Sequence, residues 1–391
     1  MDRIVSRRAT LAIAPGLLLA ASLMRFDSAL ARSLSTPIAA APGAADRLTE
    51  LLNSAVESGI PGVVLRAQVE EQEPVYASAG LASMEQSTPI SVSDRFRIYS
   101  ITKTFTAIVV LQLVDEGVLS LDDTVTKWLS APEVLDIPNT DTITLRQLLN
   151  HSSGIYDYFD DESPFINDAF LGENADWSRI WTPLELLAYA GADDHAPYNE
   201  PGQSSHYSSS NYVLLGLIVE EATGNRFVDE LQERILTPLK LTETSLPQDV
   251  PIITGTVDGY QSLEGDVVNL TSSNASWAWA AGGMVSTLDD LATFSDAVFT
   301  GSLLSPESFE EMFSFISEKP GFQLGVGIYR FDSPAGAVLA MDGESAGFSS
   351  YMVWLPDLGV SLVMLGNLGG SPLFDQLRDQ VIADIAEYGL S

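Results

Sequence analysis

The chain has 391 residues, of which 53 are Asp or Glu and 19 are Lys or Arg, so its formal net charge at pH 7 is -34. A surface this acidic repels phosphates, which argues against nucleic acid as a partner. The chain has no cysteine, which excludes disulfide bonds, a thiol nucleophile and Cys-ligated metal sites. With 46% hydrophobic residues it can bury a core, and its length suggests one large domain with an insertion, or two domains.

The first 31 residues have the pattern of a secretory signal. Basic residues precede an apolar stretch at 11–24, and Ala29-Leu30-Ala31 offers an A-x-A cleavage site. The apolar stretch is too short to span a bilayer comfortably. We therefore expect a cleaved signal and a mature chain that begins at about Arg32, in the periplasm or outside the cell. The pair Arg7-Arg8 leaves the twin-arginine export route open.

Hydrophobic periodicity predicts the secondary structure beyond a small-residue linker at 32–45. The N-terminal part should form a helix and two strands, at 46–58, 62–69 and 75–79. A helix that is apolar nearly all round, at 100–117, should lie in the interior. Amphipathic helical pieces cut by prolines follow. The last third should form strands and a closing helix, at 322–331, 336–341, 348–355, 360–366 and 373–388.

These elements fit together most simply as a sheet built from both ends of the chain, with a helical insert between them. We predict an α+β protein with two parts. An antiparallel sheet flanked by terminal helices should be made of residues 46–95 and 265–391, and an all-helical subdomain should be made of residues 96–264. The cleft between the two parts should hold the functional site.

Lys103 is the most unusual charged residue of the chain. It is one of only four lysines, and it lies on a helix that has no polar face. Ser100 precedes it by three residues, a spacing that places both side chains on one helix face. A desolvated lysine has a lowered pKa and can take the proton of a serine hydroxyl, which makes that serine a nucleophile. A buried helix with a snorkelling lysine is the alternative interpretation.

Tyr207 lies in a second polar segment, at 201–216, in a loop of small residues just before an apolar helix. A phenol in such a loop can relay protons beside a Ser–Lys pair. A simple packing role for this tyrosine is the alternative.

Together these segments resemble the serine β-lactamase and penicillin-binding-protein superfamily, in particular its branch of class C β-lactamases, D-alanyl-D-alanine carboxypeptidases and family VIII carboxylesterases. The resemblance covers nearly the whole mature chain and rests on six collinear segments, at 96–106, 111–123, 143–154, 201–216, 280–287 and 347–357. It implies a β-lactamase-like fold and an acyl-enzyme hydrolase that needs no cofactor or metal. By the same resemblance, Ser100 is the nucleophile, Lys103 its base and Tyr207 a proton-transfer group, and the backbone N–H groups of Ser100 and Glu344 form an oxyanion hole.

Two departures from the family pattern concern substrate binding. The family's Tyr-x-Asn motif falls on Tyr207-Ser208-Ser209, and Asn211 could replace the missing amide only in a rearranged loop. The family's Lys/His-x-Gly motif falls on Met341-Asp342-Gly343, where a thioether replaces the cation that meets a substrate carboxylate. The candidate substrate-binding residues are therefore Ser209, Asn211, Met341 and Gly343.

The sequence predicts an exported serine hydrolase that prefers small esters, because esters need neither missing contact and an alkoxide leaves more easily than an amine. Hydrolysis of D-amino-acid peptides or β-lactams is the alternative, and a non-catalytic binding protein that keeps the fold is an alternative of another class. We expect a small ester or peptide-like ligand and no stable membrane span, and we leave the oligomeric state open. Three arginines could restore the missing cation by folding into the cleft: Arg97, Arg146 and Arg330.

Other patterns have simpler explanations. Residues 343–347 spell G-x-S-x-G, but that motif needs a helix after its serine and a histidine later in the chain, and the sequence predicts neither. The histidines lack metal-ligand spacing, and His151 is expected to brace its loop. Trp277 and Trp279 alternate as in a strand, and either line a cleft or pack in the core. Two acidic groups are expected to be solvated faces and helix starts, at 160–162 and 289–290.

Overall fold

The computed structural model describes residues 43–70, 72–172, 175–191, 195–247, 255–263 and 266–390. The predicted signal at 1–31 and most of the linker lie outside them. The centre of the fold is a nine-stranded sheet with the strand order β3-β2-β1-β13-β12-β11-β10-β9-β8. Its strands are β1 (Gly62–Val69), β2 (Val75–Ser83), β3 (Thr88–Pro89), β8 (Ile316–Lys319), β9 (Phe322–Leu324), β10 (Tyr329–Ser333), β11 (Gly336–Ser345), β12 (Phe348–Leu355) and β13 (Val360–Gly366).

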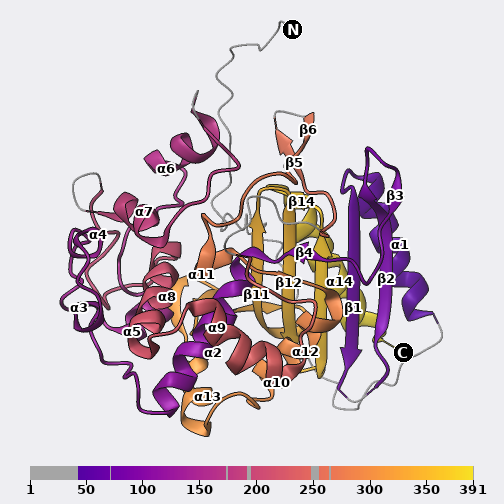
Figure 1. The fold of residues 1–391 in the computed structure, drawn as a ribbon. Coiled ribbons are helices and arrows are strands. Elements are labelled where there is room, and N and C mark those ends of the chain that lie inside the picture. Colours follow the sequence, from indigo (N-terminus) through magenta and orange to yellow (C-terminus); the bar gives the residue numbers. More distant parts are fainter. Residues whose placement is uncertain are drawn as a thin grey trace, which may run out of the picture.

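The two ends of the chain meet in this sheet. The first long strand, β1, pairs antiparallel with β13 from Val63 to Val69, so an early strand and a late strand of the chain lie side by side, to the right of the centre in Figure 1. Every other pairing in the sheet is also antiparallel. The predicted antiparallel sheet made from both chain ends is therefore confirmed.

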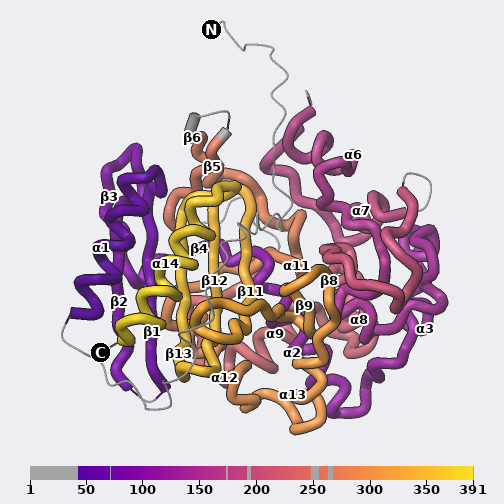
Figure 2. Tube along the Cα trace, turned by 180° about the vertical axis from the view of Figure 1, so that it is seen from behind, coloured from indigo at the N-terminus to yellow at the C-terminus, as the bar shows by residue number. Residues whose placement is uncertain are grey.

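Helices cover both faces of the sheet. On one face lie α1 (Ala44–Glu57) and α14 (Pro372–Tyr388), which also pack on each other, and Figure 2 shows α14 crossing the strands. The helix α1 buries Leu48 and Leu52, one helical turn apart. On the other face lies α12 (Leu288–Phe299), which contacts β1, β12 and β13. This arrangement of layers is the α+β, β-lactamase-like fold that the sequence predicts.

The region expected to be all-helical, 96–264, has helices as its main regular structure, but turns and loops make up about half of its described length and it contains strands at both ends. Its helices are α2 (Thr102–Asp115), α3 (Val125–Trp128), α4 (Pro132–Leu135), α5 (Leu145–Leu149), α6 (Pro164–Ile166), α7 (Pro183–Leu187), α8 (Ser209–Thr223), α9 (Phe227–Leu231) and α10 (Thr237–Leu239), with short 3-10 or π turns η1 (Tyr99–Ile101), η2 (Asn167–Leu171), η3 (Ala188–Ala190) and η4 (Gln232–Leu236). Two further helices follow it, α11 (Trp279–Gly282) and α13 (Pro306–Met312). The apolar helix α2 packs on α8, α9, α11 and α13 and lies in the interior, as predicted.

Two small sheets join the helical region to the main sheet. The first pairs β4 (Phe96–Arg97) with β7 (Val285–Ser286), and the second contains β14 (Leu368–Gly369), β5 (Tyr260–Leu263) and β6 (Asp266–Asn269). The subdomain boundary predicted at 264/265 lies outside the described residues, between the paired strands β5 and β6.

Several sequence-based assignments need correction, among them the strand predicted at 75–79, which continues to Ser83. The strand predicted at 322–331 is two strands, because the chain turns at Gly327, which has φ +70°. A Cβ there would lie 2.7 Å from Ala107 on α2, so the close approach to α2 requires glycine. The strand β11 continues past Met341 to Ser345, further than predicted. Trp279 begins the short helix α11 and is not in a strand.

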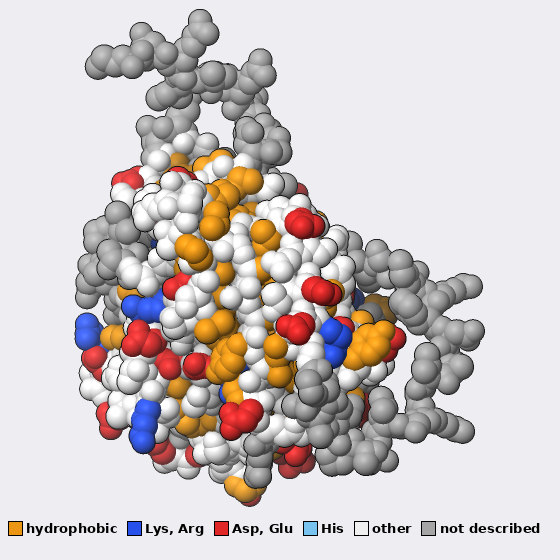
Figure 3. Space-filling view, turned by 90° about the vertical axis from the view of Figure 1, so that its right-hand side faces the viewer, with side chains coloured by type: hydrophobic (Ala, Val, Ile, Leu, Met, Phe, Trp, Pro, Cys, Tyr) orange, Lys and Arg blue, Asp and Glu red, His pale blue; other side chains and the backbone are white. Residues whose placement is uncertain are grey.

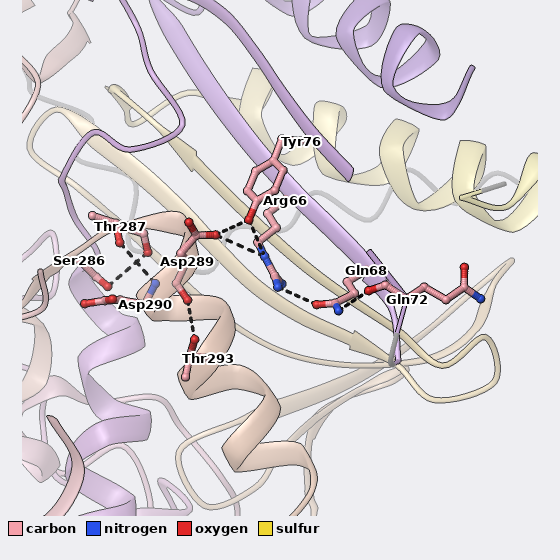
Figure 4. Close-up of polar contacts among 9 residues, drawn as sticks. All are labelled: Arg66, Gln68, Gln72, Tyr76, Ser286, Thr287, Asp289, Asp290 and Thr293. Carbon is pink, nitrogen blue, oxygen red and sulfur yellow. Dashed lines mark hydrogen bonds and ion pairs between the residues drawn. The ribbon is translucent and has the colours of Figure 1, made fainter. Parts of the chain in front are cut away.

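A polar cluster ties the start of α12 to the sheet, as Figure 4 shows. Tyr76 on β2 donates a hydrogen bond to Asp289 Oδ1 at 2.5 Å, and Arg66 Nε on β1 lies 3.5 Å from the same oxygen. Thr287 caps the helix by accepting the N–H of Asp290. Residues 289–290 therefore do mark a helix start, and Asp289 also anchors that helix to β1 and β2.

The acidic residues are spread over the surface. Figure 3 shows Asp and Glu scattered among apolar and uncharged groups on the face seen from the right of Figure 1, without gathering in one patch. No helix in the described ranges is both long and apolar enough to cross a membrane.

The contact between α2 and α12 yields a stability prediction. Phe105 and Phe294 are fully buried and stack with ring centroids 3.5 Å apart. Phe294→Ala leaves a cavity between these helices, so we expect it to lower the free energy of unfolding by about 3–5 kcal/mol in urea denaturation. Thr293→Ala, on the exposed side of the same helix, should change it by less than about 0.5 kcal/mol. Similar losses for the two variants would contradict a tightly packed interface.

Candidate active site

A cavity of about 290 Å³ lies beside the start of α2. Its walls come from the turn η1, the start of α2, the loops before α8 and α11, and β11. Six of the residues predicted for the site line it: Ser100, Lys103, Tyr207, Ser209, Met341 and Glu344. These residues are far apart in the sequence, so the cavity is a site that the fold assembles.

Ser100 and Lys103 meet at the floor of the cavity. Ser100 lies in η1, and Lys103 is in the first turn of α2. Lys103 is 1% exposed, and its Nζ donates to Ser100 Oγ at 3.1 Å, to the carbonyl oxygen of Ala281 at 2.9 Å and to Ser209 Oγ at 3.4 Å. The predicted contact between serine and lysine is therefore present, and the lysine does not snorkel to the surface.

Burial decides the charge of Lys103. Desolvation lowers its pKa to about 7, while the nearby carboxylates of Asp157 and Asp342 act in the opposite direction. A large fraction of the amine is then neutral near pH 7, whereas an exposed lysine would be almost entirely protonated. A neutral amine within hydrogen-bond distance of Ser100 Oγ can accept its proton.

Tyr207 completes the group around the serine. Its ring lies 4.8 Å from Lys103 Nζ, and its phenol takes part in a hydrogen bond with Ser100. Burial raises the pKa of Tyr207 well above its usual value, with a smaller opposing effect from the bond to Ser100. The phenol therefore stays protonated at neutral pH, and it can donate a proton to an atom beside Ser100.

His151 braces the loop that carries Tyr207, as predicted. Its ring stacks on Tyr207 at 4.4 Å, its Nδ1 accepts the N–H of Ser208 at 3.1 Å, and its carbonyl oxygen accepts the N–H of His206 at 2.8 Å. Burial, and then the charge of Lys103, lower the pKa of His151. The imidazole is therefore neutral, with Nδ1 as acceptor, and its role is to position the loop.

The predicted oxyanion-hole segments touch at Gly343. Residues 341–345 of β11 pair only with β12, because β10 reaches no further than Ala340. This stretch packs closely against the serine turn, since a Cβ on Gly343 would lie 2.0 Å from the carbonyl oxygen of Ile98 and 2.8 Å from the nitrogen of Ser100. Glycine is thus required for the strand carrying Glu344 to approach Ser100.

The structure separates the four candidate substrate-binding residues. Ser209 and Met341 line the cavity, and Gly343 contacts the serine turn. Asn211 does not line it: the side chain is fully buried, accepts a hydrogen bond from Ser153 Oγ at 2.7 Å and lies 3.3 Å from His151 Nδ1. This position corrects the expectation that Asn211 contacts a substrate, because the loop has not rearranged and the amide braces His151 instead.

No arginine restores the missing cation in the cavity. Arg97 is buried and donates to Ser273 and to the carbonyl oxygen of Thr271. Arg146 pairs with Glu311, and Arg330 lies 3.3 Å from Asp332. Among the described residues that line the cavity, Lys103 is the only Lys or Arg.

Sequence reasoning missed most of the acidic lining. Asp157, Asp160 and Glu318 line the cavity, together with Asp342 and Glu344 of β11. Burial raises the pKa of Asp157 and of Asp342 to about 6, and that of Glu344 to about 7. Asp342 lies within the Met341-Asp342-Gly343 motif and Glu344 follows it directly, so this motif was the signal by which the sequence could have indicated these two residues. The other three lie in loops or in an edge strand with no motif of their own, and Asp160 had been assigned to a solvated face.

Part of the cavity wall is aromatic. Phe159 and Trp277 stack at 4.6 Å, and Tyr99 lies 5.8 Å from the same indole. All three line the cavity. Trp277 is therefore a cleft residue, whereas Trp279 packs in the core against Phe227.

The G-x-S-x-G pentapeptide has no nucleophile-elbow geometry. Ser345 ends β11, and the chain turns directly into β12 with no helix after the serine. The fold therefore agrees with the prediction that residues 343–347 do not form a nucleophile elbow.

Comparisons with known proteins agree on the family. The beta-lactamase family model matches residues 40–387. Among solved structures, the chain is similar to a D-stereospecific amidohydrolase from Streptomyces sp., at 34% identity and a TM-score of 0.77, over 89% of this chain and 99% of that one. It is also similar to D-amino acid amidase from Ochrobactrum anthropi SV3, at 27% identity and a TM-score of 0.75, over 88% of this chain and 99% of that one.

A curated relative is longer than this chain. Penicillin-binding protein 4* from Bacillus subtilis (strain 168) is 26% identical over 312 residues, which are 75% of this chain and 65% of that protein. The chain thus spans less than two thirds of the relative's length.

The lowered pKa of Lys103 predicts how the reactivity of Ser100 depends on pH. Because only the neutral amine can accept the serine proton, the rate of Ser100 labelling by a fluorophosphonate should fall about tenfold per pH unit below about 7 and level off above it. Asp342→Asn should move the midpoint to lower pH, because it removes a negative charge that stabilises the ammonium form.

Rapid-quench labelling followed by mass spectrometry measures this profile. Lys127→Gln, which changes an exposed lysine, is the matched control and should leave the midpoint in place. A midpoint near the usual lysine value in the unmutated protein would contradict the assignment of Lys103 as the base.

Proposed function

The chain belongs to the beta-lactamase family of serine hydrolases, and on this premise we propose that it hydrolyses small amides and esters through an acyl-enzyme on Ser100. The observation that carries the proposal is the contact of 3.1 Å between Ser100 Oγ and a lysine amine that is 1% exposed. Burying an ammonium at this depth costs free energy. A lysine with such a lowered pKa in a cleft is typical of a functional site, where the neutral amine can act as a base. A non-catalytic binding protein would have no need of this pair.

The roles of the residues follow from their contacts. Lys103 takes the proton of Ser100 as its oxygen attacks the substrate carbonyl, and the N–H groups of Ser100 and Glu344 stabilise the resulting oxyanion. Tyr207 gives a proton to the leaving amine or alkoxide. Water then attacks the acyl-enzyme by the reverse sequence of proton transfers, which releases the acid and regenerates Ser100.

The charges of the cavity restrict the substrate. A carboxylate-bearing substrate would meet Asp342 and Glu344 on β11 and would find Met341 where a cation is needed. An amino-acid amide or ester has no carboxylate, and it carries an ammonium group that the acidic lining attracts. The names of the Streptomyces and Ochrobactrum relatives support an amide of this kind.

We therefore propose amides and esters of amino acids as the substrate class, with the acyl side chain against the aromatic wall. The preference for esters over amides stays a prediction, which rests on the easier departure of an alkoxide. Export through the N-terminal signal also stays a proposal, with the periplasm or the cell exterior as the place of action.

The proposed nucleophile predicts the site of a covalent adduct. During turnover of a slow ester, intact-mass spectrometry should show one acyl group, and peptide mapping should place it on Ser100. Ser100→Ala should abolish both adduct and turnover, because the proposed chemistry has no second nucleophile. Ser345→Ala is the matched control and should retain the adduct. An acyl group on Ser345 would overturn the assignment.

The uncharged Met341 predicts an order of substrates. For p-nitroanilides of one D-amino acid, kcat/KM should be highest with a free amine, lower with an N-acetyl group and lowest with an N-succinyl group, which adds a carboxylate. Met341→Lys should raise the N-succinyl rate relative to the free-amine rate by about tenfold, since it adds a positive charge to the cavity. Met84→Lys makes the same change at an exposed site and should leave the ratio unchanged. Preference of the unmutated enzyme for the N-succinyl substrate would contradict the charge argument.

A further inference from the structure

One of the two donors of the proposed oxyanion hole is the N–H of Glu344. Its direction is set by the peptide group between Gly343 and Glu344. Its carbonyl oxygen belongs to Gly343 and its N–H to Glu344, and the peptide bond keeps both in one plane. Whatever holds the carbonyl therefore also sets the direction of the N–H. This stretch of β11 pairs only with β12, so it lacks a strand on the side of Ser100.

The hydroxyl of Ser350 contacts this carbonyl. Ser350 lies on β12 directly opposite Gly343 and is 1% exposed. Its Oγ lies 3.1 Å from the carbonyl oxygen of Gly343 and 2.9 Å from the carbonyl oxygen of Ile98. A single hydroxyl thus stands between the oxyanion strand and the segment that leads into the nucleophile.

Ile98 connects this contact to Ser100. Its carbonyl oxygen also accepts the N–H of Ile101 at 3.2 Å, which closes the turn that contains Ser100. The residue between them, Tyr99, has φ +40°, a conformation that needs support from its surroundings. The Ser350 hydroxyl therefore contacts the Gly343–Glu344 peptide and the carbonyl group that closes the turn of Ser100.

The hydroxyl of Ser350 is closely surrounded by Gly343 and Ile98. A Cβ on Gly343 would lie 2.8 Å from Ser350 Oγ as well as 2.0 Å from the carbonyl oxygen of Ile98. Removal of the hydroxyl would leave two carbonyl oxygens close together without the donor between them, which favours their separation. Hydrogen bonding at a peptide carbonyl also polarises that peptide, which strengthens its N–H as a donor.

Glu344, the residue after Gly343, is held by a contact with the start of the C-terminal helix. The Glu344 carboxyl accepts the N–H of Ser371 at 3.0 Å, at the start of α14. The side chain of Glu344 is thereby fixed at the start of the C-terminal helix, and the carbonyl before it shares the single donor hydrogen of the Ser350 hydroxyl with the carbonyl of Ile98. The peptide that carries the Glu344 N–H is anchored at both ends.

We propose that Ser350 is a positioning residue of the oxyanion hole, whose hydroxyl aligns the Gly343–Glu344 peptide with the turn of Ser100. This inference rests on the proposed acyl-enzyme function. Because the oxyanion exists only in the transition state and intermediates, loss of the hydroxyl should lower kcat and leave KM nearly unchanged. A residue that only stabilises the fold would not lower kcat while KM stays nearly unchanged.

The test compares two neighbouring serines of β12. Ser350→Ala removes the proposed contact, and Ser349→Ala removes a buried hydroxyl whose hydrogen bond goes to the carbonyl oxygen of Leu368 at 2.7 Å instead of to Gly343 or Ile98. With a neutral p-nitrophenyl ester, kcat of Ser350→Ala should be about tenfold below that of Ser349→Ala, with KM within about twofold. The loss is smaller than removal of a whole oxyanion donor, because the N–H remains but is less well aligned.

A transition-state mimic provides the second measurement. Phenylboronic acid should form a tetrahedral adduct on Ser100, and its dissociation constant should rise in Ser350→Ala by the same factor by which kcat falls. Ser350→Cys retains a weak donor and should give intermediate values, and it serves as the test variant if the alanine variant does not fold.

Two outcomes separate the inference from the function. If the unmutated protein forms no adduct on Ser100, the proposed function fails. If it forms the adduct but the Ser350 variants match Ser349→Ala in kcat and in boronate affinity, the function stands and the positioning role of Ser350 is overturned.

Discussion

The buried amine of Lys103 is the interaction on which the rest of the site depends. Three oxygens accept its hydrogen bonds, from the turn η1, from the start of α8 and from α11. Each acceptor belongs to a different segment, so satisfying one nitrogen brings together the nucleophile, the Tyr207 loop and the α11 wall. Its desolvation lowers the pKa to about 7. The packing that makes α2 a core helix thus also lowers the pKa of its only lysine, which suits the proposed role of Lys103 as a base.

The sequence predicts what depends on local spacing. Ser100 and Lys103 lie three residues apart where η1 leads into α2, β12 and β13 are mainly apolar, and Gly343 precedes the proposed oxyanion donor. It does not predict what depends on the approach of distant segments. Asn211 is two residues beyond the motif position, but its place is decided by contacts with His151 and Ser153. Sequence resemblance could suggest a role for that amide, while only the packing of α8 shows which way it points.

The acidic character of the chain has two separate origins. On the face shown in Figure 3, carboxylates are scattered among uncharged groups and exposed to solvent, where a charge costs little. In the cavity, Asp157, Asp342 and Glu344 are desolvated, and each has a raised pKa. Burial makes these groups reluctant to ionise without a positive partner. A cationic ligand would stabilise their charged forms, so recognition here depends on the protonation state of the walls as much as on their shape.

The pairing of β1 with β13 has a consequence for synthesis of the chain. The first long strand must wait for a neighbour that is made near the very end, and β11 and β12 also emerge long after α2. Such distant pairing makes closure of the sheet a late and slow event. A ribosome-bound or truncated chain therefore carries Ser100 and Lys103 without the strand that completes their surroundings. The proposed site is therefore incomplete until β11 and β12 have been made and have paired, so a shorter chain has no complete site with which to act on its surroundings.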